Sequence, residues 1–320
     1  MKCRYTRRDL LGGALGAAAG AALSREERAL GGAPPASQPA GAASPKVKAN
    51  SRNTLPTGRL GELDISRVIL GGNLIAGFAH CREMVYVSRL VKEYHTEAKI
   101  FETLALAEAH GINCINTNSQ HLWLIPKYRR ECGSKIRWIV QIYPTEAKPT
   151  EDAQRALDVG ADAIYVQGNI ADSMVAKGKL DVLDAVFRWG QVQKMLVGTA
   201  AHDLAVLVAC QRGGLQPDFY VKTYHTADYP SFHYDPPRDN CWCADAKAVE
   251  QFMAKVERPW VAYKIMAAGA IPPKPAFERA FAAGADFALA GMFDFQVAAD
   301  VEIAKAALQK AKGRSRPWRA

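Results

Sequence analysis

The sequence lacks the cysteine pattern of a small domain held together by disulfides. Its 320 residues contain seven cysteines, an odd number, and Cys3 falls in the N-terminal segment. The spacings of the other six do not form a disulfide framework. Cys114 and Cys210 lie within apolar runs, where a thiol packs as a small hydrophobic side chain. A chain of this length buries a sizeable core without cross-links.

The folded part of the chain also lacks a concentrated positive charge. The formal net charge is +9, but residues 1–50 hold eight Lys or Arg against three Asp or Glu. The remainder carries 33 basic and 29 acidic residues, which is a mildly basic surface. A phosphate-backbone footprint needs a much stronger asymmetry. We therefore expect no nucleic-acid partner.

No segment after residue 23 is long and apolar enough to span a bilayer. Thr6-Arg7-Arg8-Asp9 precedes a short Gly/Ala-rich apolar run, and residues 1–23 resemble a twin-arginine signal peptide. The alternative is a membrane anchor, for which the run is too short and too rich in glycine. Residues 24–53 have the Ala, Gly, Pro and Ser composition of a disordered linker. We expect export of the folded protein by the twin-arginine machinery to the periplasm or beyond, with no stable membrane span after processing.

From residue 54 to residue 320 a phrase recurs: an amphipathic helix, a small residue with Gly, then a short apolar strand. Clear copies are His110-Gly111, Gly160-Ala161-Asp162 and Gly284-Ala285-Asp286, and a looser one is Gly213-Gly214 with Pro217-Asp218. Glycine ends each helix because it adopts positive φ at little cost. Continuously apolar strands are typical of a parallel sheet buried on both faces.

Eight strands follow from this phrase. They are Arg67–Gly71, Cys114–Asn118, Ile136–Gln141, Ala163–Gln167, Lys194–Gly198, Phe219–Thr223, Trp260–Ile265 and Phe287–Gly291. The helices expected after them are Glu97–His110, Leu122–Cys132, Glu151–Val159, Leu180–Trp189, Asp203–Arg212, Ala246–Val256, Lys274–Ala283 and Val297–Lys310. The pattern predicts an α/β fold, a single-domain (β/α)8 TIM barrel. An open doubly wound sheet is the alternative, but the first turn, Gly71-Gly72-Asn73-Leu74, lacks G-x-G-x-x-G.

Polar residues at the carboxyl ends of barrel strands are candidates for an active site. Substrate-binding candidates are Asn73, Asn116, Asn118, Gln141, Gln167, Tyr224 and Asp294. Two long loops, residues 76–94 and 226–245, leave this same face and are expected to act as lids or substrate walls, although plain surface loops are the alternative.

Lys222, Lys264, His202 and His225 are the catalytic candidates. Each lysine follows apolar residues at a strand end, where desolvation lowers the amine pKa and frees it as a base or as a Schiff-base nucleophile. The alternative for each lysine is an outward-pointing side chain whose ammonium reaches solvent between helices. The two histidines are suited to proton transfer.

Two further sites remain open in the sequence. His202, His225 and Cys243 are candidates for a divalent metal, but their spacing matches no compact metal motif. The role of Cys241 beside Cys243 is likewise open. Gly269 and Gly291 follow the last two strands, where many barrels bind phosphate through backbone amides, and ordinary tight packing is the alternative.

Residues 58–73 resemble the start of aldo/keto reductase barrels, which open with a short hairpin and a strand ending in Gly-Gly or Gly-Cys. The chain also resembles a group of exported bacterial barrel proteins, through Tyr165-Val166-Gln167-Gly168, Ala201-His202, Lys222-Thr223 and Asp294-Phe295-Gln296. The reductase resemblance implies an Asp, Tyr, Lys and His tetrad. This chain has Asn116-Thr117-Asn118, Gln141 and Gln167 at three of those places, and no Tyr at the fourth.

The leading hypothesis is an exported enzyme acting on a small carbonyl or polyhydroxy, sugar-like compound by Lys- and His-assisted proton transfer, of lyase or isomerase type. This reading requires no cofactor. The second hypothesis is an aldo/keto reductase-like oxidoreductase with a rebuilt site, which would use NADP(H). The third is a barrel that binds a solute or partner without catalysis.

Overall fold

Eight parallel strands close into a barrel in the computed structural model, which describes residues 55–81, 84, 86–233 and 240–320. The strands are β3 (Val68–Gly71), β4 (Cys114–Asn118), β5 (Arg137–Ile142), β6 (Ala163–Val166), β7 (Leu196–Ala201), β8 (Tyr220–Thr223), β9 (Trp260–Tyr263) and β10 (Phe287–Ala290). β10 pairs with β3 through Leu289 and Ile69, so the ring has no free edge. The predicted (β/α)8 TIM barrel is confirmed.

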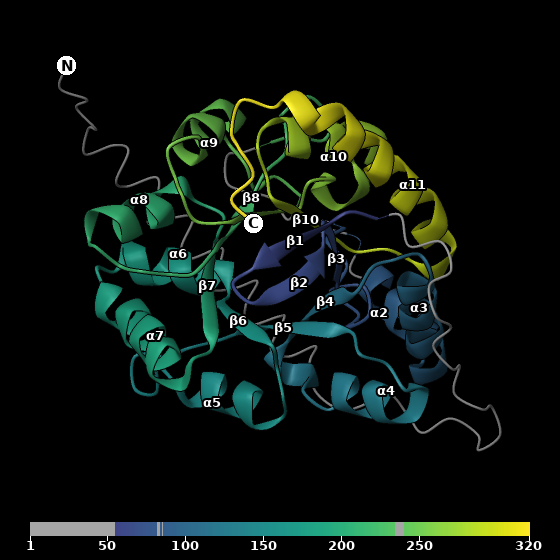
Figure 1. The fold of residues 1–320 in the computed structure, drawn as a ribbon, viewed down its shortest axis with the longest axis horizontal. Coiled ribbons are helices and arrows are strands. Elements are labelled where there is room, and N and C mark those ends of the chain that lie inside the picture. The colour runs from purple at the N-terminus through teal and green to yellow at the C-terminus, as the bar shows by residue number, and fades with distance from the viewer. Residues whose placement is uncertain (1–54, 82–83, 85, 234–239) are drawn as a thin grey trace.

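Helices surround the ring on its outer side (Figure 1). They are α2 (Tyr86–Tyr94), α3 (Glu97–Ala109), α4 (Leu124–Cys132), α5 (Glu151–Asp158), α6 (Gly168–Ala176), α7 (Leu180–Gln193), α8 (Leu204–Arg212), α9 (Ala246–Met253), α10 (Pro273–Ala282) and α11 (Asp294–Lys310). Three short 3-10 turns, Ser119–His121, Ala267–Gly269 and Ala311–Gly313, complete the described elements. None of the helices in the described ranges is long and apolar enough to cross a bilayer.

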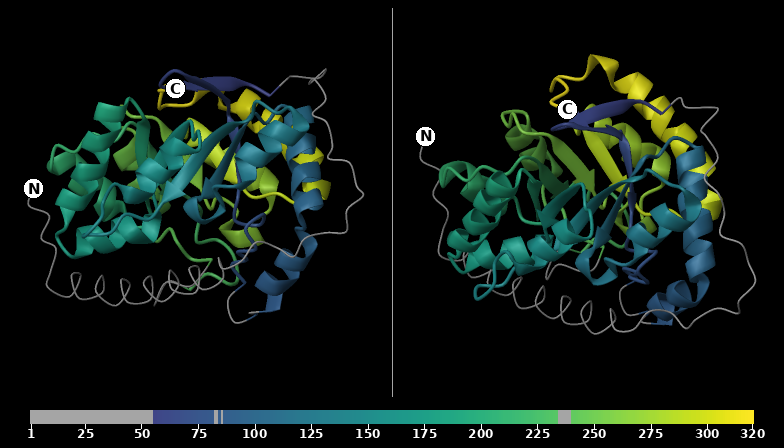
Figure 2. Two further views of the ribbon diagram at one scale, coloured as in Figure 1. Left: turned by 90° about the horizontal axis from the view of Figure 1, so that it is seen from below. Right: turned by 60° about the horizontal axis from the view of Figure 1, so that its bottom comes forward.

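An antiparallel hairpin of β1 (Thr57–Leu60) and β2 (Leu63–Ser66) precedes the barrel. The side views place it with the last residues of the chain at one end of the ring, whereas α2 lies at the other end (Figure 2). The hairpin therefore closes the end where the barrel strands begin. The opposite end, where they finish, is the mouth at which barrel enzymes carry their active sites.

The glycines expected to end helices do adopt the left-handed conformation. Gly111, Gly160, Gly214 and Gly284 have φ between 67° and 104°. The seventh helix differs, because Lys194 ends α7 in the left-handed conformation with φ 56°. That helix continues to Gln193, four residues beyond the predicted end, and β7 begins two residues later than predicted.

Two helices were absent from the sequence prediction. The segment expected as a loop at residues 76–94 contains α2, and α6 follows β6 directly. Gln167 begins α6, and its Oε1 accepts a hydrogen bond from the Ile170 N–H at 2.9 Å. Gly168, with low helix propensity, occupies the first helical position, so the start of α6 carries a weak sequence signal.

The barrel core has two layers. Each strand contributes to an inner cluster, which includes Ile69, Cys114, Tyr165, Val221 and Tyr263. The outer and larger cluster lies between the strands and the helices. Because strand side chains alternate between the two faces, the position of a polar residue within a strand decides whether it faces the barrel interior or the helices.

Four side chains tie neighbouring strands together in pairs where the strands begin. In three cases a residue just before one strand accepts a backbone N–H at the start of the preceding strand: Asp162 from Trp138 at 2.8 Å, Asp218 from Val197 at 2.8 Å and Asp286 from Trp260 at 2.9 Å. In the fourth, Asn113 accepts at 2.7 Å from the N–H of Ser66, which ends β2 two residues before β3 begins. We call these four residues the strand clamps. They explain why the recurring phrase of the sequence carries Asp. The carboxylate accepts a hydrogen bond from a backbone N–H that has no partner in the strand pairing.

Candidate active site

His202 and Asp172 form a partly buried pair at the mouth. His202 follows β7, and its Nδ1 lies 2.9 Å from Oδ2 of Asp172 on α6. The backbone N–H groups of His202 and Asp203 also donate to the Asp172 carboxylate, at 3.1 to 3.2 Å. With a proton on Nδ1, the ring presents the lone pair of Nε2 as a base. Asp172 thus fixes both the tautomer and the orientation of His202.

Burial and positive charge keep His202 neutral. Desolvation lowers the pKa of His202 well below its usual value, and the charges of Lys264 and Lys222 lower it further. Burial raises the pKa of Asp172 to about 7, although its backbone hydrogen bonds and Lys222 act in the opposite direction. A neutral imidazole beside a carboxyl group that titrates near neutrality is the arrangement of a general base with an orienting partner.

Trp242, from the long loop after β8, covers this pair. Its ring lies 4.4 Å from the His202 ring, between centroids, at an interplanar angle of 34°. The Lys264 ammonium lies 4.0 Å from the centre of the Trp242 ring, which is a cation–π contact. Lys264 Nζ is also 3.3 Å from Nε2 of His80, whose pKa is lowered well below its usual value by burial and then by Lys264. Lys264, His202 and Trp242 therefore meet at one place.

Tyr263 lies against the same pair. A Cβ placed on Gly168 would lie 2.7 Å from both Tyr263 Oη and His202 Cε1. The hydroxyl and the imidazole therefore converge on the first residue of α6, where a side chain could not fit. The Tyr263 and His202 rings are 5.7 Å apart between centroids. The site thus offers a phenol, an imidazole, an ammonium and a carboxyl group on β6 to β9 and the segments that follow them.

Lys222 lies behind this site, on the other face of the strand from the interior. Its neighbours Tyr220 and Tyr224 belong to the outer cluster and Val221 to the inner cluster, so Lys222 shares the outer face. The ammonium is fully buried and donates to the His202 carbonyl at 2.7 Å, to the Thr223 carbonyl at 3.1 Å and to Thr223 Oγ1 at 2.7 Å. The two predicted lysines therefore do not share one face of the barrel wall.

His225 is held by backbone groups on both sides of its ring. Nδ1 donates to the Thr226 carbonyl at 2.9 Å, and Nε2 accepts from the N–H groups of Trp242 and Cys243 at 3.0 and 3.1 Å. Burial lowers the pKa of His225 to about 4. This geometry anchors the Trp242 segment to β8 and leaves neither ring nitrogen for a proton or a metal.

The amide candidates on β4 and β5 form a separate group inside the barrel. Tyr165 Oη lies 3.1 Å from Asn116 Oδ1 and 3.2 Å from Gln141 Oε1, so both amide oxygens are within reach of its single proton. Asn116 Nδ2 donates to the Ile139 carbonyl at 3.1 Å, and Gln141 Nε2 donates to Tyr143 Oη at 2.8 Å. These polar side chains are hydrogen-bonded to one another on the inner face of β4 to β6.

The remaining amide candidates act mainly on local structure. Asn118 Oδ1 accepts from the Gln120 N–H and contacts His121 Nδ1, which caps the turn after β4. Gln167 caps α6. Asn73 differs, because its Nδ2 lies 3.4 Å from Nε2 of His80, so it borders the Lys264 side of the mouth.

Two candidates bond to the surrounding helices rather than to the residues around His202. Tyr224 Oη donates to Glu250 on α9, on the outer side of β8. Asp294 begins α11 and accepts from Tyr94 Oη at 2.5 Å and from Lys99 Nζ at 3.1 Å. Asp294 thus joins α11 to α2 and α3.

The glycines proposed as a phosphate cradle lie in a tight turn and a packed strand end. Gly269 has φ 92° within the turn Ala267–Gly269, and its N–H donates to the Met266 carbonyl at 2.8 Å. The Ala270 and Ile271 amides are bonded inside the same turn. Gly291 packs under Leu74, and α11 begins with the acidic Asp294. These groups do not fit the diphosphate of a nicotinamide dinucleotide.

Metal ligands are not clustered in the part of the chain that the structure describes. Within residues 55–81, 84, 86–233 and 240–320, no three His, Cys, Asp or Glu side chains are placed to hold an ion. Cys241 Sγ instead contacts the His233 N–H and Tyr229 Oη, at 3.2 and 3.7 Å. Cys241 therefore packs within the loop after β8.

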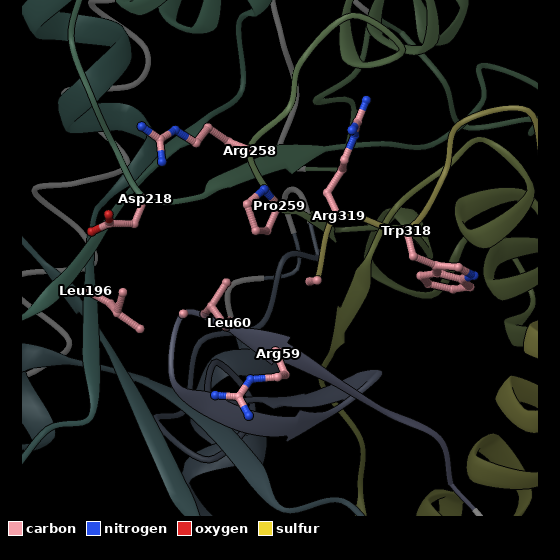
Figure 3. Close-up of a pocket in the computed structure, with 10 residues that line it drawn as sticks. Arg59, Leu60, Leu196, Asp218, Arg258, Pro259, Trp318 and Arg319 are labelled. Atoms are coloured by element: carbon pink, nitrogen blue, oxygen red, sulfur yellow. The ribbon is translucent and has the colours of Figure 1, made fainter.

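A hollow of about 520 Å³ lies at the opposite end of the barrel. Residues of β1, the starts of β7 to β9 and residues 318–320 line it. Arg258 and Asp218 lie on one side and Arg59 on the other (Figure 3). Arg59 is paired with Glu62 and Arg258 is bonded to Gln216. The hollow is separate from the His202 site.

Four residues of the site were not among the sequence candidates: Asp172, His80, Trp242 and Tyr263. Asp172 lies on a helix that the sequence did not predict, six residues after β6 ends. Trp242 and His80 lie in the two long loops that were expected to border the mouth. Tyr263 is adjacent to Lys264, so an inspection of both strand faces would have included it.

No known family model matches the chain, and no curated protein matches its sequence. Solved structures do match. Two from Pseudomonas aeruginosa, each of a provisionally assigned aldo-keto reductase, have TM-scores of 0.52 and 0.55 and 18% sequence identity. They cover 80% and 82% of this chain and 98% and 97% of their own. At this identity the likeness establishes the fold, which is the (β/α)8 barrel.

Proposed function

We propose that this protein is an enzyme with an aldo/keto reductase-like barrel and a rebuilt acid–base site, which transfers protons at a small carbonyl or polyhydroxy compound. The observation that carries the proposal is the His202–Asp172 pair beneath Trp242. A neutral, oriented imidazole at a barrel mouth is suited to removing a proton next to a carbonyl group. Lys264 supplies positive charge where an enolate oxygen would develop.

The residues divide the work by their positions. His202 accepts the proton at Nε2, and Asp172 stabilises the imidazolium that forms. Lys264 and the Tyr263 hydroxyl polarise the carbonyl oxygen or return a proton to it. The exposed side-chain amide of Asn73 and the interior amides of Asn116 and Gln141 suit a substrate with several hydroxyl groups. The result is a redox-neutral lyase or isomerase step.

Solvent exchange tests this proposal without knowledge of the natural substrate. The full chain is incubated in D2O with dihydroxyacetone, glyceraldehyde, pyruvate and a set of sugar acids, and loss of the proton next to the carbonyl is followed by NMR. We expect exchange with at least one compound, reduced about 100-fold or more in His202→Gln and in Lys264→Met. His110→Gln, at the far end of α3, is the matched control. Equal exchange in His202→Gln would refute the role of the pair.

The second candidate is an oxidoreductase, favoured by the two structural neighbours rather than by the site. It predicts saturable NADPH binding and carbonyl-dependent oxidation of that cofactor. The turn at Gly269 and the acidic start of α11 do not fit its diphosphate. Fluorescence titration of the purified protein with NADPH decides between the two candidates. Ligand binding without exchange or reduction would favour the third, a non-catalytic binding barrel.

We also propose that residues 1–23 direct export by the twin-arginine pathway. The signal and the linker at 24–53 lie outside the described residues, so Arg7 and Arg8 with the apolar run that follows are the support. Expression of the full chain with Arg7→Lys and Arg8→Lys should abolish export, and the wild-type chain should be recovered in the periplasm. Equal export of both chains would refute the assignment.

A further inference from the structure

Lys222 is the most deeply buried charged group near the mouth, and it faces away from it. Its side chain is 1% exposed, and its neighbours on the same strand face pack between the barrel and the helices. All three ammonium protons have oxygen acceptors within 3.1 Å: two backbone carbonyls and one hydroxyl. An amine on the outer face of its strand with every proton engaged is poorly placed to react with a substrate.

The acceptors of Lys222 belong to the parts that build the site. One is the carbonyl of His202 itself. Another is Thr223 Oγ1, which lies 3.1 Å from the Trp242 carbonyl oxygen and 3.2 Å from the His202 carbonyl oxygen, so that its one proton can be donated to either. The base and the ring that covers it are thus both tied to one ammonium group, directly for His202 and through Thr223 for Trp242.

The other backbone groups of these two residues are also fixed. The His202 N–H donates to Asp172, and the Trp242 N–H donates to His225 Nε2. Each residue therefore has its N–H and its carbonyl held by a side chain. Two residues pinned in this way keep their rings in one relative position, which here is the 4.4 Å stack.

We propose that Lys222 is a positioning residue rather than a catalytic one: its buried ammonium holds His202 and Trp242 in register. The inference rests on the proposed role of His202 as the base. It replaces the expectation that Lys222 reacts with substrate. Thr223, the last residue of β8, and His225, two residues later, also hold the Trp242 backbone.

The charge of Lys222 also acts on the protonation of His202, together with every other charge around that ring. Asp172 faces it from α6, Asp203 from the start of α8, Lys264 from the end of β9, His80 from the loop after β3 and Lys222 from β8. Lys222 and Lys264 both disfavour the imidazolium, and Asp203 favours it. Removing one lysine therefore raises the pKa of His202, provided that its position is kept.

The test uses the side-chain ¹⁵N signals of His202, assigned with His202→Gln, in the full chain between pH 4 and pH 9. In wild type we expect a neutral ring with the proton on Nδ1 throughout the neutral range. In Lys222→Met the protonation midpoint of His202 should rise by about one pH unit or more. The near-UV circular dichroism band of Trp242 should broaden in the same variant. Lys222→Arg should restore both. Exchange turnover should fall in kcat more than it rises in KM.

Other outcomes overturn the proposal. Unchanged His202 signals in Lys222→Met, together with lost turnover, would mean that Lys222 acts on the substrate directly. Unchanged signals with full turnover would mean that it does neither. If Lys222→Met does not fold, Thr223→Val and Lys222→Arg replace it. Thr223→Val should shift the Trp242 signal and leave the His202 titration unchanged. Lys222→Arg should leave the Trp242 signal and the His202 titration as in wild type. Failure of either expectation refutes the positioning role of Lys222. A silent exchange assay with shifted ¹⁵N signals would count against the proposed function alone.

Discussion

Oδ2 of Asp172 lies 2.9 Å from Nδ1 of His202, although thirty residues separate them in the chain. Asp172→Asn should therefore lower turnover about 100- to 10,000-fold, because an amide nitrogen facing Nδ1 favours the wrong tautomer. The raised pKa of Asp172 means that ionisation of its carboxyl group opposes folding as the pH rises from about 4 to about 7. The variant should accordingly lose little stability at pH 8.

Steady-state exchange rates and urea unfolding at pH 8 check this expectation. Asp218→Asn is the matched control, since Asp218 also accepts a backbone amide but at the far end of the barrel. Comparable turnover losses in the two variants would remove the special role of Asp172.

Gly168 leaves the space in which the Tyr263 hydroxyl and the His202 ring meet. Gly168→Ala places a methyl group 2.7 Å from both, so one ring has to move. We expect at least a tenfold loss of exchange turnover, with the helix itself retained because alanine favours it. Gly313→Ala is the control, since a Cβ there meets nothing within 4 Å. Unimpaired turnover in Gly168→Ala would show that the two rings need not converge.

His225 should make the fold acid-sensitive. Its pKa is about 4 in the folded protein against 6.5 for a free side chain, so the unfolded chain takes up a proton first as the pH falls. Stability from this group is complete above pH 6.5 and decreases toward pH 4, by about 3 kcal/mol at most. Urea unfolding of wild type and His225→Gln at pH 7 and pH 4.5 measures it. The difference between the two pH values should shrink in the variant, and an equal difference would contradict the assignment.

Asp286 should be the most sensitive strand clamp. It is fully buried and paired with Arg314 at 3.1 Å and Arg316 at 2.7 Å, each of which is 1% exposed. Asp286→Asn leaves two buried guanidinium groups without a counter-charge, which costs about 3–5 kcal/mol. Glu302→Gln, which breaks an exposed pair with Lys305, should cost less than about 1 kcal/mol. Urea unfolding of both variants at neutral pH tests the ranking, and equal losses would refute it.

The fold was accessible from the sequence because its signals are local and repeated. Gly160 and Gly284 end helices, apolar strands follow, and the eight predicted strands overlap the eight observed ones. The helix and strand boundaries that differ from the prediction are those without a glycine or another clear end signal in the sequence. Lys194 takes the left-handed cap that a glycine would have announced, and α7 extends farther than predicted.

The site was less accessible because it depends on which face of a strand a residue takes. Lys222 and Lys264 look alike in sequence, each following apolar residues at a strand end. Lys222 keeps the alternation of β8 and faces the helices, whereas Lys264 leaves β9 with φ 57° and reaches Trp242. Asp172 depends on a helix whose start, Gly168, resembles a loop. Such one-residue differences are set by tertiary packing.

The strand clamps group the ring into four modules of two strands: β3 with β4, β5 with β6, β7 with β8 and β9 with β10. Each clamp joins residues less than fifty positions apart, so the hydrogen bond of each clamp forms within the chain segment of its own module. A circular permutant opened between α4 and β5 keeps all four contacts within continuous chain, whereas one opened between β5 and α5 must form the Asp162 contact between its two new termini. The ring is in this sense made of four two-stranded units, and split-protein fragments should reassemble most readily when the chain is divided between units.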